Sequence, residues 1–258
     1  MYQVFAYLLF ACFLSACHHT APQKSARHAS SIVRTKEEGS KAQTSDLHPD
    51  LVDIQQIHSQ IQIELKYTGS DNFLGEKLYA HINKAYLQKD VALRLARVQD
   101  ALQQAHPGYK LLIYDALRPV TVQQKMWDAL DSLTPTARAK FVSNPKNLSL
   151  HNMGAALDLT ILDAQGRVLD MGAGFDDIRH IAYPIYEDSF LRTGQLSPLQ
   201  VKNRKILRNA MQAEGFRQLP TEWWHYNACS RPEAKLKYTV FYTESDIFTK
   251  PNPTSNQK

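Results

Sequence analysis

The sequence is short of cysteine. Its 258 residues contain three, Cys12, Cys17 and Cys229. The first two lie inside or at the end of an apolar run near the amino terminus, so no disulfide framework follows for the rest of the chain. The sequence therefore excludes a small domain stapled by disulfide bonds. Hydrophobic burial must stabilise the fold, and the chain is long enough for one sizeable core or two small ones.

Blocks of basic charge are also missing. The formal net charge is +5, but Lys and Arg are scattered, so we predict no nucleic-acid partner. The chain contains neither a glycine-rich loop of the kind that cradles phosphates nor the serine turn of the α/β-hydrolases. No internal repeat is visible. These absences direct attention to His, Asp, Glu and Arg as the carriers of any chemistry.

Long apolar runs are limited to residues 4–16. This run is too short to span a bilayer, but it has the length of a signal-peptide core. It continues into Leu14-Ser15-Ala16-Cys17, which resembles a bacterial lipobox, although residues 1–4 lack the usual positive charge. We predict a lipoprotein signal peptide at 1–16 and lipidation of Cys17, which would hold an exported protein on a membrane surface in the bacterial envelope, facing the periplasm. An ordinary or uncleaved secretory leader is the alternative.

Composition divides the remaining chain into three parts. Residues 17–49 are polar, with few large apolar side chains, and are expected to form a flexible tether. The folded domain is expected at 50–248, and residues 249–258 form a Pro- and Asn-rich tail.

The hydrophobic pattern within this domain mixes both kinds of secondary structure. We predict helices at 85–106, 121–130 and 200–214, and strands at 61–65, 109–115, 155–162 and 223–228. These elements do not alternate strictly as βαβ units. The pattern therefore predicts a single α+β domain, with a small antiparallel sheet flanked by helices.

One short stretch places a histidine and an aspartate seven positions apart. Asp158 lies in an otherwise apolar strand, where an unpaired carboxylate would be costly. His151 precedes it, and Gly154 between them would let the backbone turn so that both side chains meet. Imidazole and carboxylate are zinc ligands. A salt bridge or a surface loop would also explain this pair by itself.

A second stretch supplies a further imidazole and carboxylate. Glu222 and His225 flank the pair Trp223-Trp224, which indicates a buried segment. Residues three apart in a regular strand point to opposite faces, so this segment must bend, bulge or form a helical turn if both groups meet one site. The sequence leaves these three possibilities open. Arg118, just before a proline, could stabilise an oxyanion or clamp a carboxylate, or simply end a strand.

Taken together, these motifs resemble one family. Arg118-Pro119, Ser149-x-His151-x₂-Gly154-x₃-Asp158 and Glu222-x-Trp224-His225, in this order, are similar to the zinc D-Ala-D-Ala dipeptidases of the VanX type, within the wider D,D-peptidase group. The resemblance runs from about Lys66 to Tyr226. It implies a hedgehog/D,D-peptidase-like fold, one Zn²⁺ per chain, and hydrolysis of the free D-Ala-D-Ala dipeptide in cell-wall peptide turnover.

The resemblance also implies roles for individual residues. The zinc ligands would be His151, Asp158 and His225. Glu222 would be the general base, and Arg118 would steady the polarised carbonyl oxygen. The residues that hold the dipeptide would be Ser149, Asp176, Tyr67 and Tyr79, with Asp176 facing the free ammonium and the tyrosines as pocket walls.

Three alternatives remain open at this level. The first is a D,D- or L,D-carboxypeptidase that trims a peptidoglycan stem. The second, from another class, is a non-catalytic, zinc-stabilised lipoprotein that binds the cell wall. The third concerns the metal site alone, where His180 could be a supporting group or a competing ligand. Cys229 lies close to His225 in sequence, but a thiolate is not needed to complete the zinc ligands.

Overall fold

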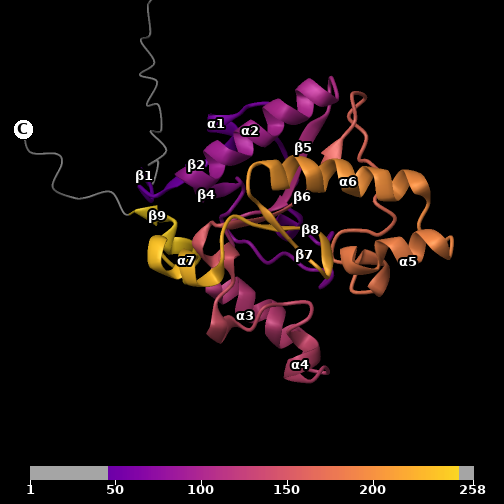
Figure 1. The fold of residues 1–258 in the computed structure, drawn as a ribbon. Helices are drawn as coiled ribbons and strands as arrows, with labels where there is room; N and C mark the ends of the chain where they lie inside the picture. Colours follow the sequence, from indigo (N-terminus) through magenta and orange to yellow (C-terminus); the bar gives the residue numbers. More distant parts are fainter. Residues whose placement is uncertain (1–45, 250–258) are drawn as a thin grey trace, which may run out of the picture. The chain divides into compact units, whose positions relative to one another are not determined.

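A five-stranded sheet lies at the centre of the computed structural model, which describes residues 46–249 (Figure 1). Its order is β3–β5–β6–β8–β7, with bounds Gln62–Ile63, Lys110–Asp115, Ala156–Leu162, Glu222–Asn227 and Arg217–Leu219. Neighbouring strands are antiparallel except for β3 and β5, which are parallel. The predicted signal peptide, Cys17 and most of the predicted tether lie outside the described residues.

Two small strand pairs and a set of helices surround this sheet. The strand pairs are β1 (Asp46–Leu47) with β9 (Phe248–Thr249) and β2 (Leu51–Asp53) with β4 (Tyr86–Gln88). The α-helices α1 to α7 are Ile54–Ile57, Lys89–Ala105, Val120–Ala129, Pro135–Arg138, Glu187–Arg192, Pro198–Ala213 and Arg231–Lys237. Short 3₁₀ helices cover Lys66–Thr68, Pro145–Asn147, Leu150–Met153, His180–Ala182, Pro184–Tyr186 and Glu244–Asp246.

The arrangement confirms the predicted α+β class. Helices α2 and α6 pack beside each other along one side of the sheet, and α3 and α4 extend away from another side (Figure 1). The parallel pairing of β3 with β5 is the one departure from an antiparallel sheet. Among residues 46–249, no helix is long and apolar enough to cross a membrane.

Helix α2 begins later than its apolar pattern predicts. The predicted helix started at residue 85, but Leu87 belongs to β4 and pairs with Val52 of β2. The backbone N–H of Gln88 donates to the carbonyl of Gly154, outside any strand, so pairing with β2 and this bond occupy the backbone of residues 86–88. From Lys89 onward the helix buries its apolar stripe against the sheet, as predicted.

Strand β6 forms the middle of the core. All but the last of its residues are buried, because β5 and β8 flank it and helices cover the sheet. Asp158 is therefore a carboxylate in the interior of the domain. At the other end of the described chain, β1 and residues 48–49 lie within the range 17–49 that the sequence assigned to a tether, and residues 17–45 lie outside the described residues.

Candidate active site

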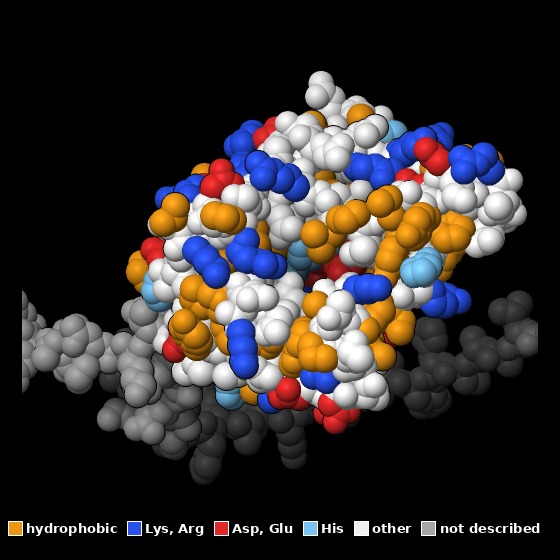
Figure 2. Space-filling model, turned by 60° about the horizontal axis from the view of Figure 1, so that its bottom comes forward, with side chains coloured by type: hydrophobic (Ala, Val, Ile, Leu, Met, Phe, Trp, Pro, Cys, Tyr) orange, Lys and Arg blue, Asp and Glu red, His pale blue; other side chains and the backbone are white. Residues whose placement is uncertain are grey.

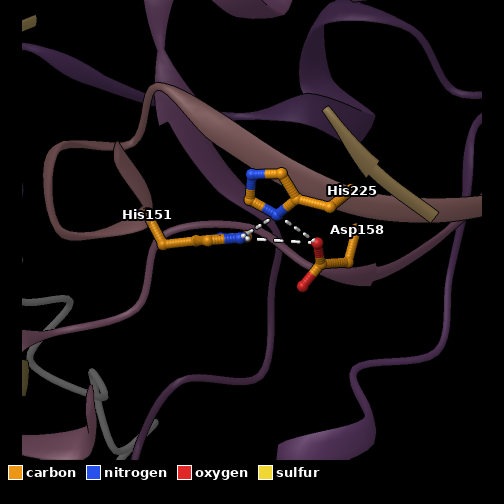
Figure 3. A group of neighbouring side chains, drawn as sticks. All are labelled: His151, Asp158 and His225. Carbon is orange, nitrogen blue, oxygen red and sulfur yellow. Dashed lines mark hydrogen bonds and ion pairs between the residues drawn. The ribbon is translucent and has the colours of Figure 1, made fainter. Parts of the chain in front are cut away.

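Three buried side chains converge on one point (Figure 3). Nε2 of His151 lies 3.2 Å from Nδ1 of His225 and 3.4 Å from Oδ1 of Asp158. Nδ1 of His225 lies 2.9 Å from the same carboxylate oxygen. Ligand atoms about 2.1 Å from a tetrahedrally coordinated ion stand about 3.4 Å apart. The predicted trio therefore has the donor types and the spacing of a three-residue metal site.

Strand register brings two of the three together. Asp158 of β6 and His225 of β8 are direct cross-strand partners, so their side chains leave the sheet on the same face. His151 comes from the 3₁₀ helix Leu150–Met153, which ends at Gly154 with φ +62°. A Cβ at this glycine would lie 3.2 Å from the backbone nitrogen of Gln88, so both the conformation and the close approach favour glycine.

The outer nitrogens of both imidazoles are also occupied. Nδ1–H of His151 donates to the carbonyl of Ala116 at 2.6 Å, and Nε2–H of His225 donates to Oδ1 of Asn227 at 3.0 Å. With the proton on the outer nitrogen, the inward nitrogen of each ring carries a free electron pair. A metal ion requires this tautomer. Burial alone would raise the pKa of Asp158, but positive charge on the two imidazoles and hydrogen bonds from them hold that pKa well below its usual range, and a bound cation would supply the same positive charge. The donor set therefore fits a divalent metal ion.

A bulge in β8 places Glu222 beside the metal ligands. Gln218 of β7 pairs with Tyr226, yet the next residue, Leu219, pairs with Glu222. The three intervening residues, Trp223–His225, have no partners in β7. Among the bend, bulge and helical turn that the sequence left open, the structure has the bulge. It brings Oε2 of Glu222 to 3.8 Å from Nδ1 of His225.

The side chain of Gln218 spans this bulge. Its Nε2 donates to the carbonyl of Trp223 at 2.7 Å and to the hydroxyl of Tyr226 at 2.9 Å. Its Oε1 accepts from Nη1 of Arg208 at 3.3 Å. Gln218 thus replaces backbone bonds that the mismatched strands cannot form. No sequence motif marked this residue, because its role depends on an irregularity in the pairing.

Glu222 has the electrostatic setting of a proton acceptor. Burial raises its pKa to about 7, with the negative charges of Asp158 and Asp176 adding to the shift and His225 opposing it. A carboxylate with a pKa near neutrality is a better general base than an ordinary glutamate. Its side chain is 17% exposed, so it can reach a molecule bound in the cleft.

Arg118 is held by a buried carboxylate that the sequence did not single out. Its Nε donates to Oδ2 of Asp115 at 2.8 Å, its Nη1 to Oε1 of Gln123 at 3.0 Å, and its Nη2 to Oδ2 of Asp158 at 3.3 Å. Asp115 ends the buried strand β5 and is fully buried. Its place three residues before Arg118 was the available signal. The hydroxyl of Tyr79 donates to Asp115 at 2.5 Å.

A cleft with about 890 Å³ of empty space, its open mouth included, lies over these groups. In Figure 2 it is a hollow with imidazole and acidic side chains on its floor. Ser149, Tyr67 and Asp176 line it, as predicted for residues that touch a substrate. Tyr79 does not line it, which corrects its prediction as a pocket wall. This tyrosine lies behind Asp115, because its hydroxyl bonds to that buried carboxylate.

Asp176 forms no ion pair with any Lys, Arg or His among residues 46–249. Both of its oxygens accept from the hydroxyl of Tyr67, at 3.1 Å each. Burial raises the pKa of Asp176 to about 7, with the charge of Asp158 adding to the shift. An ammonium group beside it would restore the charged form.

Two other candidates lie outside the metal cluster. The exposed ring of His180 packs against Tyr183 and Tyr186, with centroid distances of 5.0 and 5.6 Å. Cys229 is a half-buried free thiol. Neither belongs to the three-residue cluster found among the described residues.

Comparisons with known proteins identify the family of this chain. Residues 48–245 match the family described as "Peptidase_M15: D-ala-D-ala dipeptidase". A D-alanyl-D-alanine dipeptidase from Escherichia coli K12 is 34% identical over 74% of this chain and 93% of its own length. A protein of the same name from Synechocystis is 30% identical, covering 55% and 68%. Another from Enterococcus faecalis V583 is 30% identical, covering 67% and 88%. The chain belongs to peptidase family M15, the family of the D-Ala-D-Ala dipeptidases, which confirms the resemblance inferred from its motifs.

Proposed function

We propose that the protein is a zinc-dependent D-alanyl-D-alanine dipeptidase that acts in cell-wall peptide turnover. The observation that carries this proposal is the convergence of His151, Asp158 and His225 beside a fourth group, Glu222, which a purely structural metal site would not need. Two histidines and one carboxylate are a ligand set of the kind that holds catalytic zinc, and they would hold the ion here. The family membership of the chain supports the same activity.

The three ligands would hold one Zn²⁺ per chain. Such an ion lowers the pKa of a bound water to about 7 and polarises a carbonyl group. Glu222, with its raised pKa, accepts the proton of the attacking water and then delivers it to the leaving amine.

Arg118 provides the positive charge beside the reacting carbonyl. Asp115 and Gln123 fix its guanidinium in place, so the group is oriented before the substrate arrives. We assign to it the stabilisation of the negative charge on the carbonyl oxygen. A donor of this kind contributes about 2.7–4 kcal/mol to lowering the barrier.

Asp176 favours a dipeptidase over a carboxypeptidase. A free dipeptide carries an ammonium group close to its scissile bond, whereas a peptidoglycan stem carries an uncharged amide at the same place. A buried carboxylate with a pKa near 7 gains most from an ammonium partner. Ser149, whose hydroxyl accepts from the backbone N–H of His151 at 3.3 Å, lies in the cleft beside the ligands and is assigned to substrate positioning.

Hydrolysis by the purified protein tests the proposal directly. Release of D-Ala would be measured from D-Ala-D-Ala, from its N-acetylated form and from a muropeptide ending in D-Ala-D-Ala. We expect zinc-dependent cleavage of the free dipeptide, and about one zinc per chain by elemental analysis. Faster cleavage of the acetylated dipeptide or of the muropeptide would instead identify a carboxypeptidase. Bound zinc without any hydrolysis would favour a non-catalytic wall-binding protein.

We further propose that the protein is a lipoprotein of the bacterial envelope. This rests on the lipobox-like sequence ending at Cys17. Dual signals, such as several acyl chains on one cysteine, give stable membrane attachment. Growth with a labelled fatty acid should label the wild-type protein but not a Cys17→Ser variant. Equal labelling of both, or a soluble wild-type protein in fractionated cells, would refute the anchor.

A further inference from the structure

Two cations in the cleft have no partner in the described part of the chain. Three basic residues line the cleft, namely Arg118, Lys140 and Arg231. Arg118 is ion-paired with Asp115 and Asp158. Lys140 and Arg231 are exposed and form no ion pair or side-chain hydrogen bond within residues 46–249. Their charges are therefore available to a bound molecule.

Both cations come from segments that are attached to the metal centre. Gln123, which accepts from Arg118, also donates from Nε2 to the carbonyl of Ser143 at 2.9 Å, and so holds the segment of Lys140 near that guanidinium. Arg231 is the first residue of α7, which packs through Ala234 against the 3₁₀ helix Leu150–Met153 that carries His151. Figure 2 shows basic side chains around the hollow whose floor holds the imidazoles.

Acidic and basic groups in the cleft belong to different segments. Asp176 and Glu222 come from the loop after β6 and from the start of β8, whereas Lys140 and Arg231 come from the segment after α4 and from α7. A free dipeptide has the matching pair of charges, an ammonium group and a carboxylate. Arg118 is assigned to the carbonyl oxygen and is already ion-paired with two protein carboxylates, so the carboxylate of the substrate needs other cations.

We propose that Lys140 and Arg231 form the subsite that binds the free carboxylate of the substrate. This inference rests on the proposed dipeptidase function and names the group that the cleft recognises at its second charged end. Both side chains are solvent-accessible, so each contact is of the weak, salt-sensitive kind. Together they make the cleft selective for substrates that end in a carboxylate rather than an amide.

The test compares two substrates on three forms of the full-length zinc protein. The substrates are D-Ala-D-Ala and its C-terminal amide, and the measured quantity is the ratio of their kcat/KM values. The double variant Lys140→Gln/Arg231→Gln removes both cations from the cleft. The control Lys146→Gln/Lys235→Gln removes the same charge from exposed neighbours in sequence that do not line the cleft.

We expect the double variant to lower the acid-to-amide ratio about 5- to 20-fold, mainly through KM for the acid. The control should keep the wild-type ratio. In addition, KM for the acid should rise with salt in the wild type and change much less in the double variant. A wild-type ratio in the double variant, with D-Ala-D-Ala still hydrolysed, would overturn the subsite alone. Absence of hydrolysis by the wild type would overturn the dipeptidase proposal and the subsite with it.

Discussion

Gln218→Leu tests whether the bulge in β8 positions the catalytic groups. Leucine is apolar and one atom shorter, so it cannot donate to the carbonyl of Trp223 or to the hydroxyl of Tyr226, which Gln218 now contacts at 2.7 and 2.9 Å. Each buried group left without its partner costs about 1–3 kcal/mol. Both hydrogen bonds are only part-buried, so we expect a total loss of about 2–4 kcal/mol of unfolding free energy. For a domain of this size that lowers Tm by about 5–12 °C.

The effect on turnover should be larger than the effect on metal binding. His225 remains paired with Asp158 through β6, whatever happens on the β7 side. Glu222 has no such second strand, because β6 pairs with β8 only from His225 onward. A displacement of about 1 Å at a reacting group costs up to 10²-fold in rate. We therefore expect kcat to fall about 10- to 100-fold while zinc stays close to one per chain.

Steady-state kinetics, elemental analysis and thermal unfolding would be measured on the same preparations. Gln212→Leu, an exposed glutamine on α6, is the matched control and should leave all three unchanged. If Gln218→Leu lowers Tm but keeps kcat within twofold of the wild type, Gln218 stabilises the sheet without positioning Glu222, and our account of the bulge is wrong.

Three further variants test the assigned roles. Glu222→Ala should keep zinc but reduce turnover at least 10²-fold, since the proton acceptor is gone; normal turnover would remove it as the base. His151→Ala should lose the metal itself, so retained stoichiometric zinc would exclude it as a ligand. Asp176→Asn should raise KM for D-Ala-D-Ala. Burial raises the pKa of Asp176 in the folded protein to about 7. This carboxyl therefore lowers the free energy of unfolding as pH rises from about 4 through about 7. The Tm of the metal-free Asp176→Asn variant should therefore fall less over that pH range than the Tm of the metal-free wild type. The same pH dependence of Tm in both proteins would refute the raised pKa of Asp176.

The ligands could be predicted because their chemistry conflicts with their surroundings. Asp158 lies among apolar residues of a strand, and Glu222 and His225 flank two tryptophans, so burial could be inferred from composition alone. Periodicity likewise located strands β5, β6 and β8 and the longer helices, since these elements bury one clear face. The boundary at Leu87 failed because strand pairing with β2 was not visible in a helical pattern.

The supporting residues could not be predicted in the same way. Asp115 orients Arg118, and Asn227 orients His225, through contacts that exist only once the sheet has formed. Gln218 depends on a three-residue mismatch between two strands that no local pattern encodes. Tyr79 was assigned to the pocket wall, although its hydroxyl faces a buried carboxylate instead. Sequence motifs identified the reacting groups, while the tertiary structure determines their orientation.

The register between β6 and β8 ties the metal site to the hydrophobic core. Leu157 and Tyr226 are the next cross-strand pair after Asp158 and His225, and both are fully buried. Because side chains alternate between the faces of a strand, a slip of one residue would turn His225 to the face now held by Tyr226. It would also turn Tyr226 toward the cleft, so that its hydroxyl would lose the hydrogen bond from Gln218. Burial of the Leu157–Tyr226 pair therefore fixes the register that holds Asp158 opposite His225.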